Sequence, residues 1–213
     1  MCRLLLIKSE TEFPIADFLK KFSLIAKNSK EYQGHGWGFA YLESGKWKVY
    51  KNIQPIWKTE LSQFSDIKTK KILAHARSAF KDEGVIVENN MPFSDEEKVF
   101  IFNGELRGVK INEKGRIGAE KIFNFIKRFD KGNLFEAIKK AVEIIKKRTK
   151  YIRAINIIIS NSENDYVVSI FNEDPEYFTM HCKKNKYVIV CSEPFPNEDG
   201  WEKIGNNTIK VLE

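Results

Sequence analysis

Cysteine and histidine are scarce in this 213-residue sequence, with three residues of each type. The number of cysteines is odd and shows no CxxC spacing, so neither a disulfide framework nor a cysteine-based zinc site is indicated. The histidines show no helical metal-ligand spacing and no nearby carboxylate pattern. We therefore expect no metal, no cofactor and a reducing, cytoplasmic environment. The positions are Cys2, Cys182, Cys191, His35, His75 and His181.

Long apolar runs are also absent. The first run, residues 4–7, is far shorter than the roughly 7–15 residues of a signal-peptide core, and no stretch approaches the ~20 residues of a membrane span. No repeat, low-complexity tract or linker rich in Pro, Gly and Ser divides the chain. We expect a soluble protein with no membrane segment and one domain over residues 1–213.

Positive charge is in excess, with a net charge of +7 and a pI near 9.1. Lysines gather at residues 68–71 and 139–150, and such clusters can bind nucleic acid. In the second cluster they alternate with apolar residues, which favours a helix with one solvated basic face, and aromatics for base stacking are missing. We expect no nucleic-acid partner, and polyanion binding that collapses as salt rises remains the alternative.

The pattern of apolar residues predicts a mostly antiparallel α+β layered fold. Helical spacing occurs at residues 14–26, 119–129 and 134–147. Strands are predicted at residues 2–7, 71–78 and 99–103, and residues 36–42 and 46–51 form a hairpin across Ser44-Gly45. A polar loop covers residues 81–90. Further strand-like runs follow at residues 154–160, 166–171, 177–181, 187–191 and 208–212.

Cys2 is a candidate nucleophile because removal of Met1 is expected before a residue this small. The thiol and a free α-amine would then belong to one residue. An α-amine titrates near 7.7–8.0 and a thiol near 8.5, so the amine can take the thiol proton at neutral pH. The alternative is that Cys2 is a small apolar residue of a buried strand.

Two more positions carry side chains suited to acyl chemistry. Arg77 ends an apolar strand, where its guanidinium could grip a carboxylate through two parallel hydrogen bonds, or form an ordinary surface ion pair. Asn103 and Gly104 could donate their side-chain amide and backbone N–H to an oxyanion. Asn-Gly is also the commonest tight hairpin turn, and taken alone the dipeptide favours the turn.

Taken in order, several blocks resemble those of the class II glutamine amidotransferases. The small stand-alone branch, which includes γ-glutamyl hydrolases, is the most similar. The blocks are Met1-Cys2-Arg3-Leu4, Gly34-His35-Gly36-Trp37-Gly38-Phe39-Ala40, Ala74-His75-Ala76-Arg77-Ser78, Asn90-Met91-Pro92-Phe93, Phe102-Asn103-Gly104-Glu105-Leu106 and Cys191-Ser192-Glu193-Pro194.

This resemblance implies the four-layer αββα sandwich of N-terminal nucleophile hydrolases. Cys2 would be the nucleophile, with its freed amine as the base, and Arg77 would hold the substrate α-carboxylate. Asn103 and Gly104 would stabilise the tetrahedral oxyanion. The implied substrate is glutamine or another γ-glutamyl amide, cleaved to release ammonia or an amine. An ammonia acceptor would belong to a separate synthase subunit.

The sequence also departs from the family pattern. Met91 stands where the family usually has His, and His35 stands where Asp is expected. Gly118 takes the place of the acidic residue that binds the substrate amine, which shifts the expected substrate from glutamine towards γ-glutamyl amides in general. The alternative is a catalytically degenerate member that binds a ligand or a partner.

Overall fold

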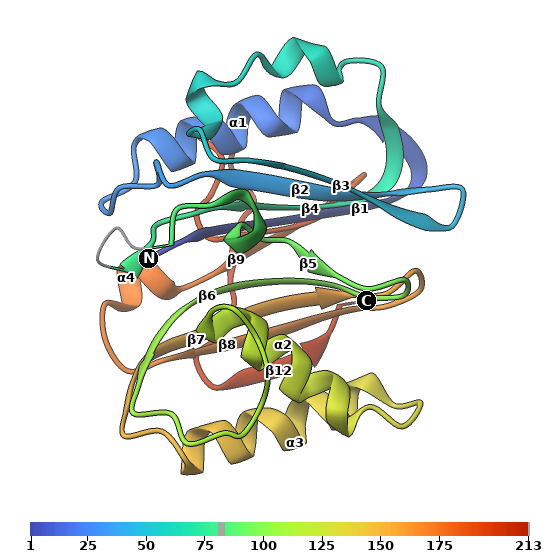
Figure 1. Cartoon of the computed structure of the whole chain (residues 1–213). Helices are drawn as coiled ribbons and strands as arrows, with labels where there is room; N and C mark the ends of the chain where they lie inside the picture. The colour runs from blue at the N-terminus through green and yellow to red at the C-terminus, as the bar shows by residue number, and fades with distance from the viewer. Residues whose placement is uncertain (81–83, 213) are drawn as a thin grey trace.

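The computed structural model describes residues 1–80 and 84–212, so part of the predicted loop at residues 81–90 lies outside the described residues. Two antiparallel β-sheets face one another, and helices cover the outer face of each sheet (Figure 1). This arrangement confirms the αββα sandwich. No helix in the described ranges is long and apolar enough to cross a membrane.

The first sheet has seven strands in the order β11-β9-β10-β1-β4-β2-β3. Helix α1 (Ala16–Lys27) and two 3-10 turns, Ile56–Lys58 and Leu61–Phe64, cover its outer face. The strands are β1 (Arg3–Pro14), β2 (Trp37–Glu43), β3 (Lys46–Asn52), β4 (Lys68–Ala76), β9 (His181–Lys184), β10 (Val188–Cys191) and β11 (Glu202–Lys203).

The second sheet has five strands in the order β12-β8-β7-β6-β5. Helices α2 (Gly118–Phe129) and α3 (Leu134–Lys147) pack on its outer face (Figure 1). A third 3-10 turn, Val87–Asn89, precedes β5. The strands are β5 (Phe93–Ser94), β6 (Val99–Arg107), β7 (Tyr151–Ser160), β8 (Asp165–Phe171) and β12 (Thr208–Val211).

Strand β1 shows why the central strands are apolar on both faces. Leu5 and Ile7 pack towards α1, whereas Leu4 and Leu6 pack into the space between the sheets, and all four side chains are fully buried. Successive side chains of a strand point to opposite faces, so a strand covered on both sides reads as a continuous apolar run. Polar side chains on the inner faces therefore stand out.

The predicted hairpin is confirmed, because β2 and β3 pair from Trp37–Asn52 to Glu43–Lys46. Ser44 and Gly45 both have positive φ, as a tight two-residue hairpin turn requires. The strand predicted at residues 177–181 is wrong.

The chain at that point forms a short helix, α4 (Pro175–Phe178), with Pro175 in its first turn, where the lack of an N–H costs nothing. Strand β9 starts only at His181. Tyr177 and Phe178 are both buried, which is why this short segment resembles a strand in the sequence.

Candidate active site

Cys2 lies immediately before β1, at the end of the sandwich where Figure 1 marks the N-terminus between the sheets. Its backbone N–H donates to Asn103 Oδ1 at 2.8 Å, and its Sγ lies 3.7 Å from the carbonyl oxygen of Ser78. Burial raises the pKa of the Cys2 thiol, partly offset by the terminal ammonium and Arg77. The thiol therefore stays protonated near neutral pH and needs a base to become a nucleophile.

Asn103 reaches Cys2 from the second sheet. Together with Gly104 it lies inside β6, opposite Asn156 and Ile155 of β7, so the alternative reading of Asn-Gly as a hairpin turn is wrong. The Asn103 side chain is fully buried. Its Oδ1 accepts from Cys2, while its Nδ2 has no hydrogen-bond partner among the described residues. A buried amide donor without a partner is costly, so it is available to a ligand oxygen.

Arg77 lies beside Cys2, because Arg3 pairs with Ala76 in the antiparallel β1–β4 ladder, Cys2 directly precedes Arg3, and Arg77 directly follows Ala76. The residue is only 6% exposed, so it lies inside the protein and not on its open surface. Nη1 donates to Gly84 O at 2.9 Å and to Asn90 Oδ1 at 3.2 Å. These bonds orient the guanidinium within the site, and burial lowers its pKa.

Met1 precedes Cys2, so the Cys2 nitrogen is an amide in this structure. The Met1 carbonyl accepts hydrogen bonds from Gln33 Nε2 at 2.5 Å and from the Tyr177 hydroxyl at 2.7 Å. Its ammonium forms an ion pair with Glu31. Sequence reasoning missed Gln33 and Tyr177, because nothing in their spacing connects them to a residue as distant in the chain as Met1.

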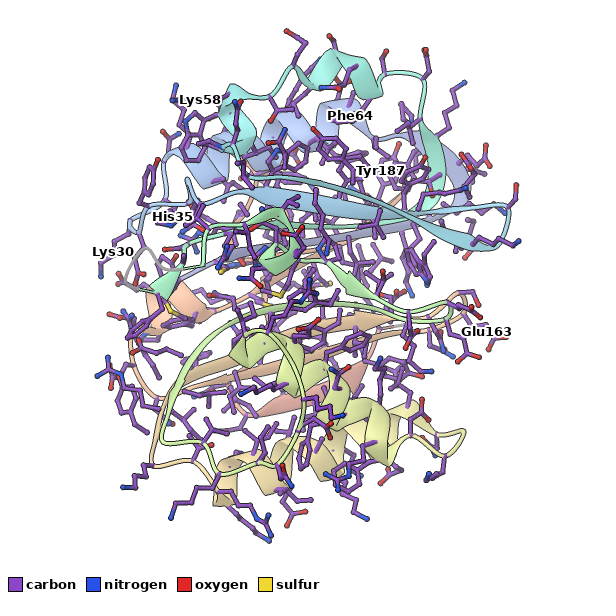
Figure 2. All side chains as sticks on the ribbon, in the orientation of Figure 1. Lys30, His35, Lys58, Phe64, Glu163 and Tyr187 are labelled. Atoms are coloured by element: carbon purple, nitrogen blue, oxygen red, sulfur yellow. The ribbon has the colours of Figure 1, made fainter. Side chains whose placement is uncertain are left out.

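Two histidines lie near the site. His75 is fully buried on β4, and burial, together with nearby Arg77, lowers its pKa to about 3, so the ring is neutral. His35 accepts the Ala79 N–H at its Nδ1 at 2.9 Å, and Figure 2 shows it at the same end of the molecule as the N-terminus. The described residues contain no group of three or more His, Cys, Asp and Glu side chains that could hold a metal ion.

The positions that depart from the expected pattern have distinct settings. Met91 is buried in the core between the sheets, where an apolar side chain packs well. Gly118 opens α2, and a Cβ added there would meet no atom within 4 Å. A larger side chain would therefore fit at Gly118, so packing does not explain the absence of an acidic residue.

Comparison with known proteins gives a consistent result. The family model described as glutamine amidotransferases class-II matches residues 1–195. A glutamine aminotransferase class-II domain protein from Silicibacter pomeroyi superposes with a TM-score of 0.69 at 13% identity, covering 99% of this chain and 94% of that chain. A comparison with curated proteins gives no match.

Two further solved structures share the fold. A predicted glutamine amidotransferase from Pseudomonas aeruginosa has a TM-score of 0.61 at 14% identity, with 99% of this chain and 96% of that chain covered. The glutamine phosphoribosylpyrophosphate amidotransferase from B. subtilis has a TM-score of 0.64 at 18% identity, covering 90% of this chain. The match spans only 42% of that longer chain.

Proposed function

Because this chain belongs to the class II glutamine amidotransferases, we propose that it hydrolyses a γ-glutamyl amide through a thioester on Cys2. The observation that carries the proposal is the double role open to Asn103. Its Oδ1 holds the Cys2 nitrogen at 2.8 Å, and its Nδ2 is a buried donor with no partner in the described part of the chain. One side chain can thus position the base and receive an oxyanion.

In the proposed reaction, loss of Met1 frees the α-amine of Cys2, which takes the proton of its own thiol. The thiolate attacks the amide carbon, and the oxyanion receives hydrogen bonds from Asn103 Nδ2 and the Gly104 N–H. Collapse expels ammonia or an amine, protonated by the α-ammonium, and leaves a glutamyl thioester. Water, activated by the same amine, then hydrolyses the thioester and releases the acid.

Substrate binding is proposed to depend on Arg77. Its guanidinium is buried next to Cys2, which suits a bidentate hold on the α-carboxylate of the glutamyl group. Gly118 provides no carboxylate for an α-ammonium, so glutamine or another γ-glutamyl amide would be held chiefly through its α-carboxylate.

We further propose that residues 1–213 form one glutamine amidotransferase domain and act in the cytoplasm, which fits three free cysteines. If ammonia is the product, its acceptor would bind to a separate synthase subunit. The phosphoribosylpyrophosphate amidotransferase is the relevant comparison, because the match accounts for only 42% of that chain.

Covalent trapping tests the proposed nucleophile. Protein whose intact mass shows loss of Met1 is incubated with a diazo-ketone analogue of glutamine, and we expect one adduct, mapped to Cys2 by peptide mass spectrometry. The Cys2→Ala variant should take up no label, and Cys191→Ala, which removes a fully buried thiol, should label like the wild type. Full amidase activity with Met1 retained would refute the amine-as-base mechanism.

The second candidate function is a degenerate family member that binds a γ-glutamyl ligand or a partner without cleaving it. Gly118 and Met91 favour it, because both replace residues usual in the family. Such a protein would bind the diazo-ketone analogue reversibly and give no adduct after processing of Met1. The trapping experiment therefore separates the two functions.

A further inference from the structure

Lys51 lies in the row of residues that crosses the first sheet beside the candidate site. It pairs with Gly38 on β2, Gly38 pairs with His75 on β4, and His75 pairs with Leu4 on β1. Gly38 has no side chain, and a Cβ built there would lie 3.2 Å from Lys51 Cγ. The stem of Lys51 therefore passes over Gly38 on the inner face of the sheet, close to the site.

Two cations share one aromatic ring at the end of this row. Lys51 Nζ lies 5.2 Å from the centre of the Phe93 ring, and Arg116 Cζ lies 5.8 Å from the same centre. Hydrogen bonds connect this region to Arg77, because Asn90 accepts from Arg77 at 3.2 Å and donates to the carbonyl of Asn52 at 2.8 Å. Asn52 directly follows Lys51, so the Asn90 side chain bridges the Arg77 guanidinium and the backbone next to Lys51.

The nearby carboxylates do not neutralise Lys51. Glu120 is engaged by Arg116, with Nη2 at 2.6 Å from Oε1 and Nε at 3.0 Å from Oε2. Glu88 is exposed to solvent. Among the described residues no carboxylate oxygen comes within 4.0 Å of Lys51 Nζ, whereas Lys71, Lys98 and Lys183 each have a carboxylate oxygen at 2.9–3.2 Å.

The titration of Lys51 fits this setting. Burial and the neighbouring Arg116 lower its pKa to about 8, while Glu120 and Glu88 act in the opposite direction. His75, which faces it across Gly38, is neutral, because its own pKa is lowered to about 3. Lys51 is therefore mainly protonated at pH 7 and becomes neutral as the pH rises through about 8.

We infer that Lys51 is a specificity-determining residue that acts together with Arg77. The two cations select amide substrates that carry a carboxylate and no free ammonium at the end remote from the amide. In such substrates the amine is absent or acylated. The inference rests on the proposed amidase function. A free ammonium at that end would lie near Lys51 and Arg116, and the Glu120 carboxylate that could balance it is already bound to Arg116. A carboxylate there is attracted by both cations.

Competing amide substrates test this selectivity. We expect kcat/KM for glutaramate, which lacks the amine, and for N-acetylglutamine to exceed that for glutamine by about tenfold or more, the effect of one charge interaction of 1.4 kcal/mol. In Lys51→Met, which keeps an unbranched apolar stem and removes the charge, the ratio should fall to within about threefold of unity, chiefly through a higher KM for the anionic amides. Lys51→Arg should retain the preference.

A control and a pH series make the result specific to Lys51. Lys48→Met removes an exposed lysine from the same strand and should leave the substrate ratio unchanged. For glutaramate, we expect kcat/KM of the wild type divided by kcat/KM of Lys51→Met to decline towards unity as the pH rises through about 8. The reason is that Lys51 of the wild type loses its charge over this range, whereas the variant has no charge there to lose. The catalytic groups shared by both proteins cancel in this ratio.

Two results would overturn the inference. If the wild type prefers glutamine to glutaramate, the selectivity is refuted while the proposed amidase function stands. The same holds if the ratio of kcat/KM for glutaramate to kcat/KM for glutamine is unchanged in Lys51→Met. If no amide is hydrolysed and the diazo-ketone fails to label processed Cys2, the proposed function itself fails, and the inference falls with it. Labelling at Cys2 thus distinguishes the two failures.

Discussion

At the scale of single residues, Asn103 should matter more for the rate than for the fold. Removing its amide in Asn103→Ala takes away the proposed donor for the oxyanion and the acceptor for the Cys2 nitrogen. We expect kcat to fall by about 10²–10³-fold with a much smaller change in KM, as for other oxyanion-hole donors. Steady-state kinetics on a γ-glutamyl amide measure both constants.

Asn156 is the matched control, because it faces Asn103 from the neighbouring strand and is equally buried. Its side chain has partners, donating to Phe178 O and accepting from the Ile170 N–H. Asn156→Ala should lower the midpoint of thermal unfolding while kcat stays within about threefold of the wild type. The hydrogen bonds lost in this variant stabilise the folded protein and do not reach the reacting atoms. Equal losses of kcat in both variants would contradict the role given to Asn103.

The sequence indicated some of these residues and not others for a physical reason. Cys2, Arg77 and Asn103 stand in blocks whose local spacing carries information. Lys51 and Gln33 make contacts across sheets and loops, and a lysine on a strand looks the same in the sequence whether it faces solvent or the inner face of the sheet. Only the pairing of Lys51 with Gly38 places its stem inside the sandwich.

At the scale of elements, β6 depends on Gly104. A Cβ added there would lie 2.1 Å from Ala154 O of β7 and 2.6 Å from Phe102 Cζ, so the two strands would have to separate. We expect Gly104→Ala to lower the free energy of unfolding by about 1–3 kcal/mol, the usual cost of overpacking. Urea denaturation followed by circular dichroism gives the value.

Gly118→Ala provides the comparison, because the added Cβ meets no atom within 4 Å and lies in the first turn of α2. Its effect should lie between no change and a gain of about 1 kcal/mol, since alanine favours a helix over glycine. If Gly104→Ala were as stable as the wild type, β6 and β7 could move apart enough to accept the added methyl group without loss of stability, which would contradict this prediction.

Most elements were predictable because their apolar period is local. The helix predicted at residues 134–147 has those bounds in the structure, and the predicted helix at 119–129 begins one residue earlier, at Gly118. Strands were less certain at their ends, as β1 continues to Pro14, well beyond the predicted residue 7. The strand prediction at residues 177–181 was wrong because the segment is too short to show an apolar period. Two adjacent buried aromatics fit a strand and a single helical turn equally well.

At the scale of the whole molecule, a buried ion pair connects the two sheets away from the candidate site. Asp165 of β8 is fully buried and lies 3.0 Å from Lys71 Nζ of β4, whose side chain is 6% exposed. Lys8 of β1 approaches the same carboxylate at 3.5 Å. Lys8 lies six residues from Cys2 along an extended strand, which corresponds to about 20 Å. Figure 2 shows the neighbouring Glu163 at the end of the molecule opposite His35.

Asp165→Asn should therefore weaken the fold without altering the chemistry. The substitution leaves the Lys71 ammonium buried between the sheets without a carboxylate, with only uncharged oxygens as partners, such as Asn161 O at 3.0 Å. Breaking a buried pair in this way costs about 3–5 kcal/mol, so the urea midpoint should drop while kcat at low temperature is retained. The double variant Asp165→Asn/Lys71→Met removes both charges of the Asp165–Lys71 pair, leaves the partly exposed Lys8, and should recover a large part of the loss. If the double variant were as unstable as the single one, the cost would come from altered packing and not from the unpaired charge of Lys71.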